Sequence, residues 1–293
     1  LPGFVFFRLL LQTGGLYAAY GLLYGVALHY WLFDRDAVKK ASAYLSRRFP
    51  ESGGIMIRLK CYRLFISQGK QLIDRMAAIS DLVDFDFTLL GKERLSELSE
   101  RTTGFVLLTA HAGNWQIAMT TLERIGKSVH LVMHPEQNAA VQESLNISAD
   151  AAMLGTIPPS GGPGEVVRII KLLKEGGIVS FMGDRPYEAA TGEVTFMGDR
   201  AAFPLGAFSV AAAAEVPVVI LLASKTGRKS YTVDFTNVMN PVYEKGKSKR
   251  KQLAEWAQQY ADILTDFFRK SPYQCFLFYD VWGPPEKRKD PKG

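Results

Sequence analysis

The alternation of short apolar runs with helical segments between residues 105 and 270 constrains the fold most. Five runs have the length and the branched or aromatic composition of buried strands. They cover residues 105–110, 128–133, 178–182, 217–223 and 230–236. Segments with helical spacing lie between or after them, at 115–125, 136–149, 164–175, 204–214 and 249–270. This alternation predicts an α/β fold in which a single mixed or mostly parallel sheet is flanked by helices.

The first 35 residues have a different character. From Leu9 to Phe33 the chain has no Lys, Arg, Asp or Glu, and about twenty apolar residues are enough to span a bilayer. Its four tyrosines and Trp31 favour a membrane interface, whereas Gln12 and the Gly14–Gly15 pair weaken the spanning interpretation. We therefore expect a membrane-associating helix over 1–35, either spanning the bilayer or lying in its interface. The alternative is a buried core helix.

Residues 36–293 are expected to form one α/β domain, which begins with amphipathic helices over 36–81. Basic residues dominate directly after the apolar run, and this bias places the domain on the cytoplasmic side of a membrane. The two cysteines, Cys61 and Cys275, have no metal-binding or redox-motif spacing and are expected to be reduced, buried thiols.

The charge balance favours anionic partners. The chain has 35 Lys and Arg against 29 Asp and Glu, a net charge of +6. Basic residues cluster at 225–229, 245–251 and 286–289. Charge alone leaves nucleic acid, phospholipid and an acidic carrier protein open as partners.

The six residues from His111 to Gln116 (His-Ala-Gly-Asn-Trp-Gln) directly follow the strand predicted at 105–110. On one helix, positions five apart are separated by roughly 140°, so His111 and Gln116 would not share a face. They can meet if His111 lies in the loop and looks back over the first helical turn. This places the imidazole at the carboxyl edge of the sheet, where α/β proteins bind ligands.

This block resembles the His-x4-Asp/Glu motif of the lysophospholipid acyltransferase superfamily, especially the His-x-Gly-Asn-Trp-Glu form of the late acyltransferases of lipid A biosynthesis. Phe-Met-Gly-Asp-Arg at 181–185, the segment 192–219 and the segment 271–282, which begins Ser-Pro-Tyr-Gln-Cys, are also similar to blocks of that family. Phe-Met-Gly-Asp-Arg recurs at 196–200, and we interpret the two copies as similar turns around a hairpin. The resemblance covers most of the chain and is specific for the superfamily, not for the substrate.

The resemblance implies transfer of a fatty acyl chain from an acyl thioester to a hydroxyl of a lipid or glycolipid, at the cytoplasmic face of the inner membrane. The thioester is carried by acyl carrier protein or coenzyme A. Neither a cofactor nor nucleic acid is implied. The acceptor remains open among phosphorylated sugar lipids, amino-acid lipids, glycolipids and pigment headgroups.

In this interpretation His111 is the general base, because a neutral imidazole suits proton removal from an alcohol. Gln116 replaces its acidic partner, and Glu193 is expected as a supporting acid. Asp184 and Arg185 are expected to contact the substrate, Arg185 as an anion clamp. The remaining candidate substrate-site residues are Gly113, Asn114 and Trp115, which shape the turn and cover the pocket; the backbone of 112–115 is expected to contribute to an oxyanion site.

Gln116 departs from the family pattern, which has Glu or Asp there. Three interpretations follow: another carboxylate supports His111, a substitution silences turnover, or the chain is a non-catalytic homologue that binds lipid or carrier. Thioester hydrolysis, with water in place of the alcohol, is a further alternative. His130, His134 and Glu136 have a spacing related to zinc sites, but His130 lies in a predicted strand, so no metal is expected.

Overall fold

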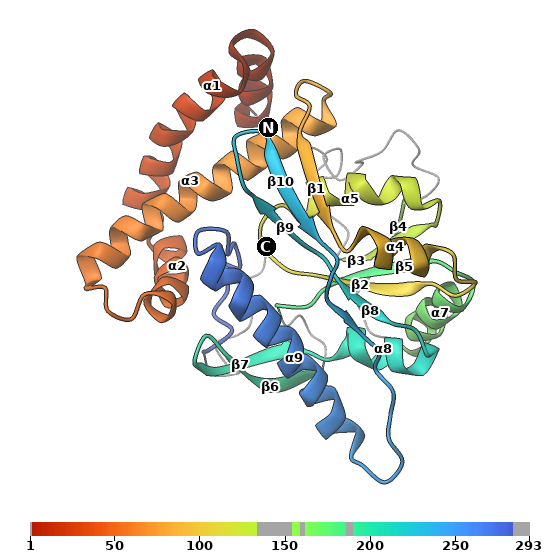
Figure 1. The fold of residues 1–293 in the computed structure, drawn as a ribbon. Coiled ribbons are helices and arrows are strands. Elements are labelled where there is room, and N and C mark those ends of the chain that lie inside the picture. Colours follow the sequence, from red (N-terminus) through yellow and green to blue (C-terminus); the bar gives the residue numbers. More distant parts are fainter. Residues whose placement is uncertain (1, 134–153, 159–161, 186–189, 284–293) are drawn as a thin grey trace.

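The computed structural model describes residues 2–133, 154–158, 162–185 and 190–283, and it has an α/β architecture with mixed sheets (Figure 1). A six-stranded sheet has the order β11-β8-β2-β5-β3-β4, and its strands are parallel except for β11. The strands are β2 (Phe105–Thr109), β3 (Val129–Val132), β4 (Leu154–Ile157), β5 (Ile178–Met182), β8 (Val218–Ile220) and β11 (Val238–Met239). The strands predicted at 105–110, 128–133 and 178–182 are confirmed.

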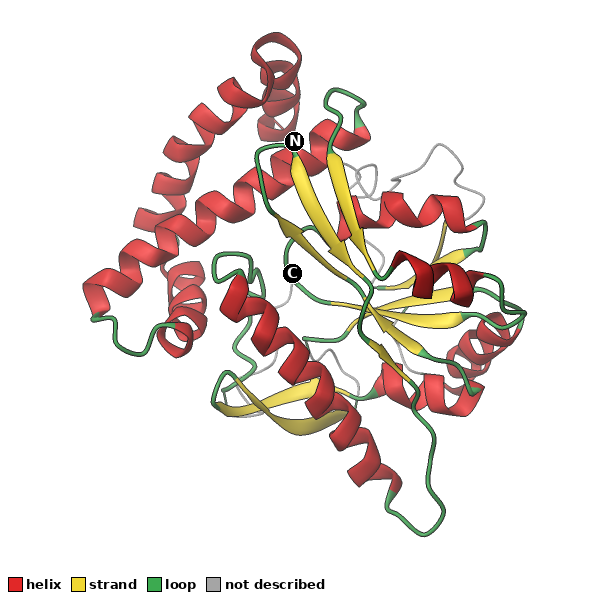
Figure 2. Cartoon of the chain, in the orientation of Figure 1, coloured by secondary structure: helices red, strands yellow, loops and turns green. Residues whose placement is uncertain are grey.

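Helices cover both faces of this sheet, as Figure 2 shows, so all five residues of β2 are buried. Val106 and Leu108 pack in the cluster that includes α7, α8 and α9, whereas Phe105 and Leu107 pack in the cluster with α4 and α5. The helices are α4 (Lys92–Ser99), α5 (Trp115–Met119, continued by a 3₁₀ turn over Thr120–Ile125), α7 (Pro163–Lys174), α8 (Gly206–Ala214) and α9 (Lys249–Lys270). The helices predicted at 164–175, 204–214 and 249–270 are confirmed; the one predicted at 136–149 lies outside the described residues.

The apolar run at 217–223 serves two sheets, which corrects the expectation of a single sheet. Ile220 pairs with Leu108 in the central sheet, and Leu222 pairs with Asp234 in a second sheet. That second sheet has the order β1-β10-β9 and consists of β1 (Asp86–Leu90), β10 (Ser230–Asp234) and β9 (Leu222–Lys225). The change occurs at Leu221, so a continuous apolar sequence hides the boundary between β8 and β9.

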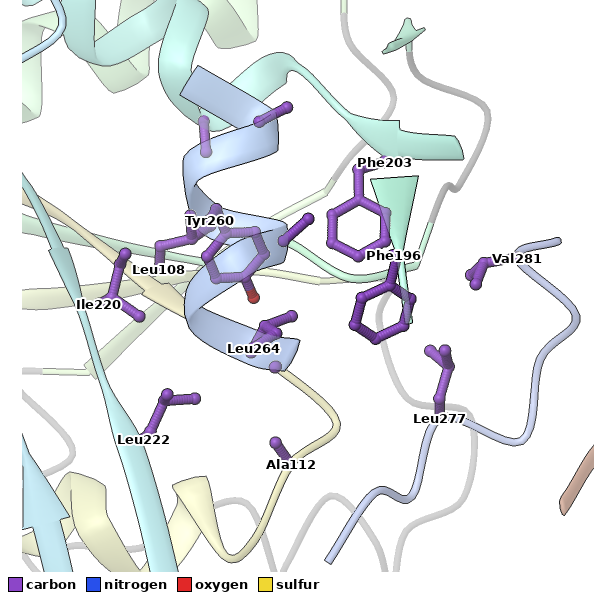
Figure 3. Packing of buried hydrophobic residues seen from close by; sticks show 14 of the residues in the cluster. Leu108, Ala112, Phe196, Phe203, Ile220, Leu222, Tyr260, Leu264, Leu277 and Val281 are labelled. Carbon is purple, nitrogen blue, oxygen red and sulfur yellow. The ribbon is translucent and has the colours of Figure 1, made fainter. Parts of the chain in front are cut away.

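A hairpin of β6 (Thr191–Phe196) and β7 (Asp199–Pro204) packs beside α9. Its tight turn has positive φ at Met197 (55°) and Gly198 (91°). Figure 3 shows Tyr260 of α9 between Leu108 of the central sheet and the hairpin rings Phe196 and Phe203. The interpretation of the two Phe-Met-Gly-Asp-Arg copies as similar turns around a hairpin is therefore corrected. The second copy forms the hairpin turn, whereas the first copy contains the last two residues of the parallel strand β5.

Three helices precede the sheets: α1 (Pro2–Phe33), α2 (Arg35–Arg48) and α3 (Gly54–Ile79). The prediction of amphipathic helices over 36–81 is confirmed by α2 and α3. Helix α1 has a kink at Gly15, where φ is 66°, and packs on α3 through a separate apolar cluster that includes Leu16, Ala19 and Ile73. Gly69 permits this approach, because a Cβ there would lie 2.2 Å from Leu23 Cδ1.

The expectation that the N-terminal run could span a membrane is corrected. Within residues 2–133, 154–158, 162–185 and 190–283, the structure contains no helix with the length and apolar character needed to cross a bilayer. Helix α1 is interrupted at Gly15 and buries Leu16, Ala19 and Leu23 against its neighbours.

Candidate active site

His111 lies two residues beyond the end of β2, and Asp184 lies two residues beyond the end of β5. These strands are parallel neighbours in which Thr109 pairs with Met182. Because their carboxyl ends lie side by side, the register brings His111 and Asp184 together. The His111 backbone N–H donates to Asp184 Oδ2 at 2.7 Å, and His111 Nδ1 lies 2.9 Å from Asp184 Oδ1.

Burial differs between the two partners in a way that suits acid–base chemistry. The Asp184 side chain is 2% exposed, whereas the His111 side chain is 24% exposed. An ionised Asp184 accepts the proton of Nδ1–H, which leaves the lone pair on Nε2. The imidazole is thus oriented by a buried carboxylate and still has access to solvent.

The backbone behind this pair is closely packed. Gly183 N–H and the Tyr260 hydroxyl both donate to the Thr109 carbonyl, at 2.9 and 2.7 Å. A Cβ on Gly183 would lie 2.7 Å from Leu108 Cδ1 and 2.8 Å from Tyr260 Cε1. Complete burial raises the pKa of Tyr260, and the charge of Asp184 raises it further, so this hydroxyl keeps its proton. Tyr260 and Leu108 therefore leave no room for a side chain at position 183, directly before Asp184.

Gly113 and Asn114 form the turn after His111. Gly113 has φ of 56°, and a Cβ there would lie 1.7 Å from the Ala223 carbonyl oxygen. Asn114 caps α5, and its Oδ1 accepts from the Ile117 N–H at 3.4 Å. The amides of Gly113 and Asn114 donate to the carbonyls of Gln274 and Ala223, at 2.8 and 3.0 Å. These two amides are therefore engaged within the fold, which leaves them unsuited to the expected oxyanion site.

Trp115 begins α5 and packs, partly buried, against the cluster that contains Phe105 and Leu107. Together with the Gly113 and Asn114 contacts, this packing agrees with a role in shaping the turn. Contact of these three residues with a substrate stays a prediction.

Gln116 contacts α3. Its Oε1 accepts a hydrogen bond from Arg75 Nη1. Burial lowers the pKa of this arginine. Gln116, which stands where the family pattern has an acid, thus contacts the Arg75 guanidinium and not His111. The acidic side chain that contacts the His111 ring is Asp184.

Glu193 lies on β6 with its side chain 68% exposed, and its Oε1 is 3.5 Å from Arg200 Nη1. The carboxylate that contacts His111 in the described part of the chain is Asp184. The structure therefore does not bring Glu193 to His111. Arg185 follows Asp184 and places its guanidinium 5.0 Å from the centre of the Tyr279 ring; its role as an anion clamp stays a prediction.

The structure also shows polar residues around the turn that the sequence analysis missed. They are Asp74, Arg75, Lys225, Tyr231 and Gln274. Asp74 and Arg75 are adjacent on α3, and Lys225 and Tyr231 pair across β9 and β10, but no local spacing relates these two pairs to each other or to Gln274 after α9. A charged Asp74 among the apolar positions of α3 is the one signal that could have marked a buried site. The prediction that both cysteines are buried thiols is confirmed. Of His130, His134 and Glu136, whose spacing is related to zinc sites, His134 and Glu136 lie outside the described residues.

An α/β fold with a solvent-accessible histidine on a buried aspartate, at the carboxyl edge of its sheet, is typical of acid–base enzymes. The sequence over residues 67–283 matches the family described as bacterial lipid A biosynthesis acyltransferase. Because the match covers well over half of the chain, the chain belongs to this family, and the resemblance seen in the sequence is confirmed. The protein is therefore a lipid acyltransferase.

No curated protein matches the sequence. Among solved structures, the chain is similar to the 1-acyl-sn-glycerophosphate acyltransferase of Thermotoga maritima, with 13% identity and a TM-score of 0.40. The alignment covers 84% of this chain and 96% of the other.

Proposed function

We propose that His111 is the general base of an acyl transfer from a thioester to a lipid hydroxyl. The observation that carries the proposal is the contact of His111 Nδ1 with the buried Asp184 carboxylate. It fixes the ring and directs Nε2 away from the carboxylate, as a neutral base for the alcohol proton. Membership of the family indicates the class of reaction, and the His111–Asp184 pair offers a base that can carry it out.

In the proposed reaction, Nε2 removes the proton of the acceptor hydroxyl while its oxygen attacks the thioester carbonyl carbon. The carbon–oxygen bond of the product ester forms, and the carbon–sulfur bond breaks. The imidazolium then gives its proton to the departing thiolate, which leaves as a thiol. Asp184 stabilises the imidazolium during this sequence, because a charge-assisted hydrogen bond is roughly twice as strong as a neutral one.

This arrangement favours catalysis over the binding-only alternative that Gln116 raises. A carboxylate at position 116 is not required to orient His111, since Asp184 already does so through two hydrogen bonds. Of the three interpretations of Gln116, the proposal adopts the one in which another carboxylate supports the histidine, with Asp184 in that role instead of Glu193.

The donor in the proposal is an acyl chain on acyl carrier protein or coenzyme A, and the acceptor is a lipid or glycolipid. The experiment follows a labelled acyl chain from each thioester into a total lipid extract. We expect His111→Ala to lower kcat by a factor of about 10³ and Glu193→Gln to change it less than about twofold. Equal rates for His111→Ala and the parent would contradict the proposal. Release of free fatty acid without acceptor would instead indicate hydrolysis.

The proposal also places α1 in a membrane interface at the cytoplasmic side. Helix α1 and the start of α3, which lie together away from the central sheet in Figure 1, expose large apolar side chains. These include Phe6, Leu9, Tyr17, Phe33, Ile55 and Met56. Cations lie among them, with Arg58 over the Trp31 ring at 5.2 Å and Arg228 over the Tyr17 ring at 4.1 Å. Apolar side chains next to cations suit a surface of anionic lipid.

Vesicle flotation tests this part of the proposal. The double substitution Phe33→Ser and Ile55→Ser changes side chains that are 70% and 84% exposed, so the fold should persist. We expect this variant to float poorly with vesicles that contain anionic phospholipid. The control changes Val167 of α7 and Val242 of the loop before α9 to Ser; these side chains are 66% and 68% exposed. Equal flotation of the two variants would rule out this surface as the docking site.

A further inference from the structure

Asp74 of α3 is a fully buried carboxylate outside the His111–Asp184 pair. It accepts hydrogen bonds from three elements: the Tyr20 hydroxyl of α1, the Tyr231 hydroxyl of β10, and Lys225 Nζ of β9 at 2.5 Å. The Lys225 side chain is 13% exposed. Apolar groups of similar size in place of a buried ion pair are often at least as stabilising, so stability alone is a weak reason for this cluster.

The Tyr231 side chain connects Asp74 to Asn114, in the turn that follows His111. The Tyr231 hydroxyl donates to Asp74 and accepts from Asn114 Nδ2 at 3.4 Å. Asn114 Nδ2 also donates to the Gln71 carbonyl at 2.9 Å, and Asn114 is 5% exposed. Burial and the charge of Asp74 raise the pKa of Tyr231, so its hydroxyl stays protonated and able to donate.

Gln274 makes a second connection, between Lys225 and the turn. Its side-chain amide forms hydrogen bonds with both backbone groups of Lys225, at 2.8 Å to the N–H and 3.0 Å to the carbonyl. Its backbone carbonyl accepts from the Gly113 N–H at 2.8 Å. Gly113 and Asn114, which follow His111 closely in sequence, are therefore both connected to the residues around Asp74.

We propose that Asp74 is a positioning residue. Together with Tyr231 it holds the turn that carries His111 in place, and its hydrogen bond with Tyr20 connects this turn to α1. The inference rests on the proposed role of His111 as the base. Correct placement of a catalytic group affects rate strongly, because displacement by about 1 Å costs up to a hundredfold. Full turnover then requires the Tyr20 hydroxyl of α1 to stay on Asp74, so the helix proposed to contact the membrane also supports the active turn.

The experiment removes single hydroxyls and keeps the rings. Tyr231→Phe is expected to lower kcat about tenfold, with KM for the thioester within about twofold, because the loss is one of position and not of binding. Tyr20→Phe is expected to lower kcat about threefold, since Tyr20 contacts Asp74 whereas Tyr231 also contacts Asn114 of the turn directly. The matched control is Tyr62→Phe, whose hydroxyl joins α3 to the Tyr24 carbonyl of α1 without contacting Asp74; its kcat should equal that of the parent.

A structural role and a positioning role give different results. All variants are measured well below their unfolding temperatures, with the folded fraction determined by circular dichroism. A lower unfolding temperature with an unchanged kcat for Tyr231→Phe would overturn the inference. In the double variant Tyr20→Phe with Tyr231→Phe, the loss of kcat should be smaller than the product of the two single losses, because both act through one carboxylate. A simple product would overturn the coupling to α1.

Failure of this inference is separable from failure of the proposed function. If His111→Ala is inactive while Tyr231→Phe keeps full kcat, the positioning inference alone is wrong. If His111→Ala is as active as the parent, the proposed base is wrong, and Asp74 loses the role inferred from it.

Discussion

The two copies of Phe-Met-Gly-Asp-Arg, at 181–185 and 196–200, have the same five residues and different environments. In the first copy, Asp184 is 2% exposed and hydrogen-bonded to His111. In the second, Asp199 is 58% exposed and forms a surface ion pair with Arg47 at 2.8 Å. The first copy ends a central parallel strand and the second forms a hairpin turn. The chemistry of a short motif here depends on the strand that positions it.

The largest expected difference is between two variants, each of which replaces one of the two aspartates by asparagine. Asp184→Asn should lower kcat by a factor of about 10² to 10³, no more than the loss of His111 itself. The amide has one acceptor oxygen where the carboxylate has two, so it cannot accept from both the His111 backbone N–H and the ring Nδ1–H, and it has no charge to stabilise the imidazolium. Asp199→Asn should change kcat less than about twofold, because an exposed ion pair contributes about 1 kcal/mol or less to stability. Steady-state acyl transfer from the thioester checks both variants. Similar losses in the two would break the comparison.

The glycines of the two copies provide a second contrast. Gly183→Ala should destabilise the fold by about 2 kcal/mol and lower kcat roughly tenfold, because the added Cβ displaces Tyr260 and Leu108 next to the catalytic pair. Gly198→Ala should cost about 1 kcal/mol through its positive φ of 91° and leave kcat unchanged. Thermal unfolding and turnover are measured together. Full activity in a folded Gly183→Ala protein would show that the packing behind Asp184 does not affect catalysis.

The smallest expected effect concerns the residue that departs from the family pattern. Gln116→Glu should change kcat less than about fivefold, because position 116 contacts Arg75 whereas Asp184 already contacts His111. The same acyl-transfer assay applies, with the parent as reference. A gain of a hundredfold or more would mean that Gln116 silences the enzyme and that Asp184 does not replace the missing acid.

Local patterns in the sequence predicted the parts of the fold that rest on local physics. The buried strands at 105–110 and 178–182 and the helix at 249–270 have strong apolar runs or helical periodicity, and the structure has them. The sequence analysis missed β1, β4, β6, β7 and β11. Strands β1 and β6 alternate between more and less exposed positions and so have no continuous apolar run, and β7 begins with two exposed residues. Strands β4 and β11 are only four and two residues long.

The candidate site was predictable only in part. The spacing placed His111 in the loop after a strand, which is correct, but it did not identify the acid beside it. That contact depends on the pairing of Thr109 with Met182, and no short-range pattern encodes which strands become neighbours. Likewise, Tyr20 and Asp74 are far in sequence from each other and from the paired residues Lys225 and Tyr231, and the four meet only after α1, α3 and the second sheet have assembled.

The protonation state of the His111 ring tests the central claim most directly. The chain has four histidines, so ¹⁵N-labelled imidazoles give few signals in a long-range ¹H–¹⁵N spectrum, and His111→Ala identifies the signal of interest. At a pH where the ring is neutral, we predict a proton on Nδ1 and a lone pair on Nε2, with this preference lost in Asp184→Asn. A neutral His111 with its proton on Nε2 in the parent protein would contradict the account.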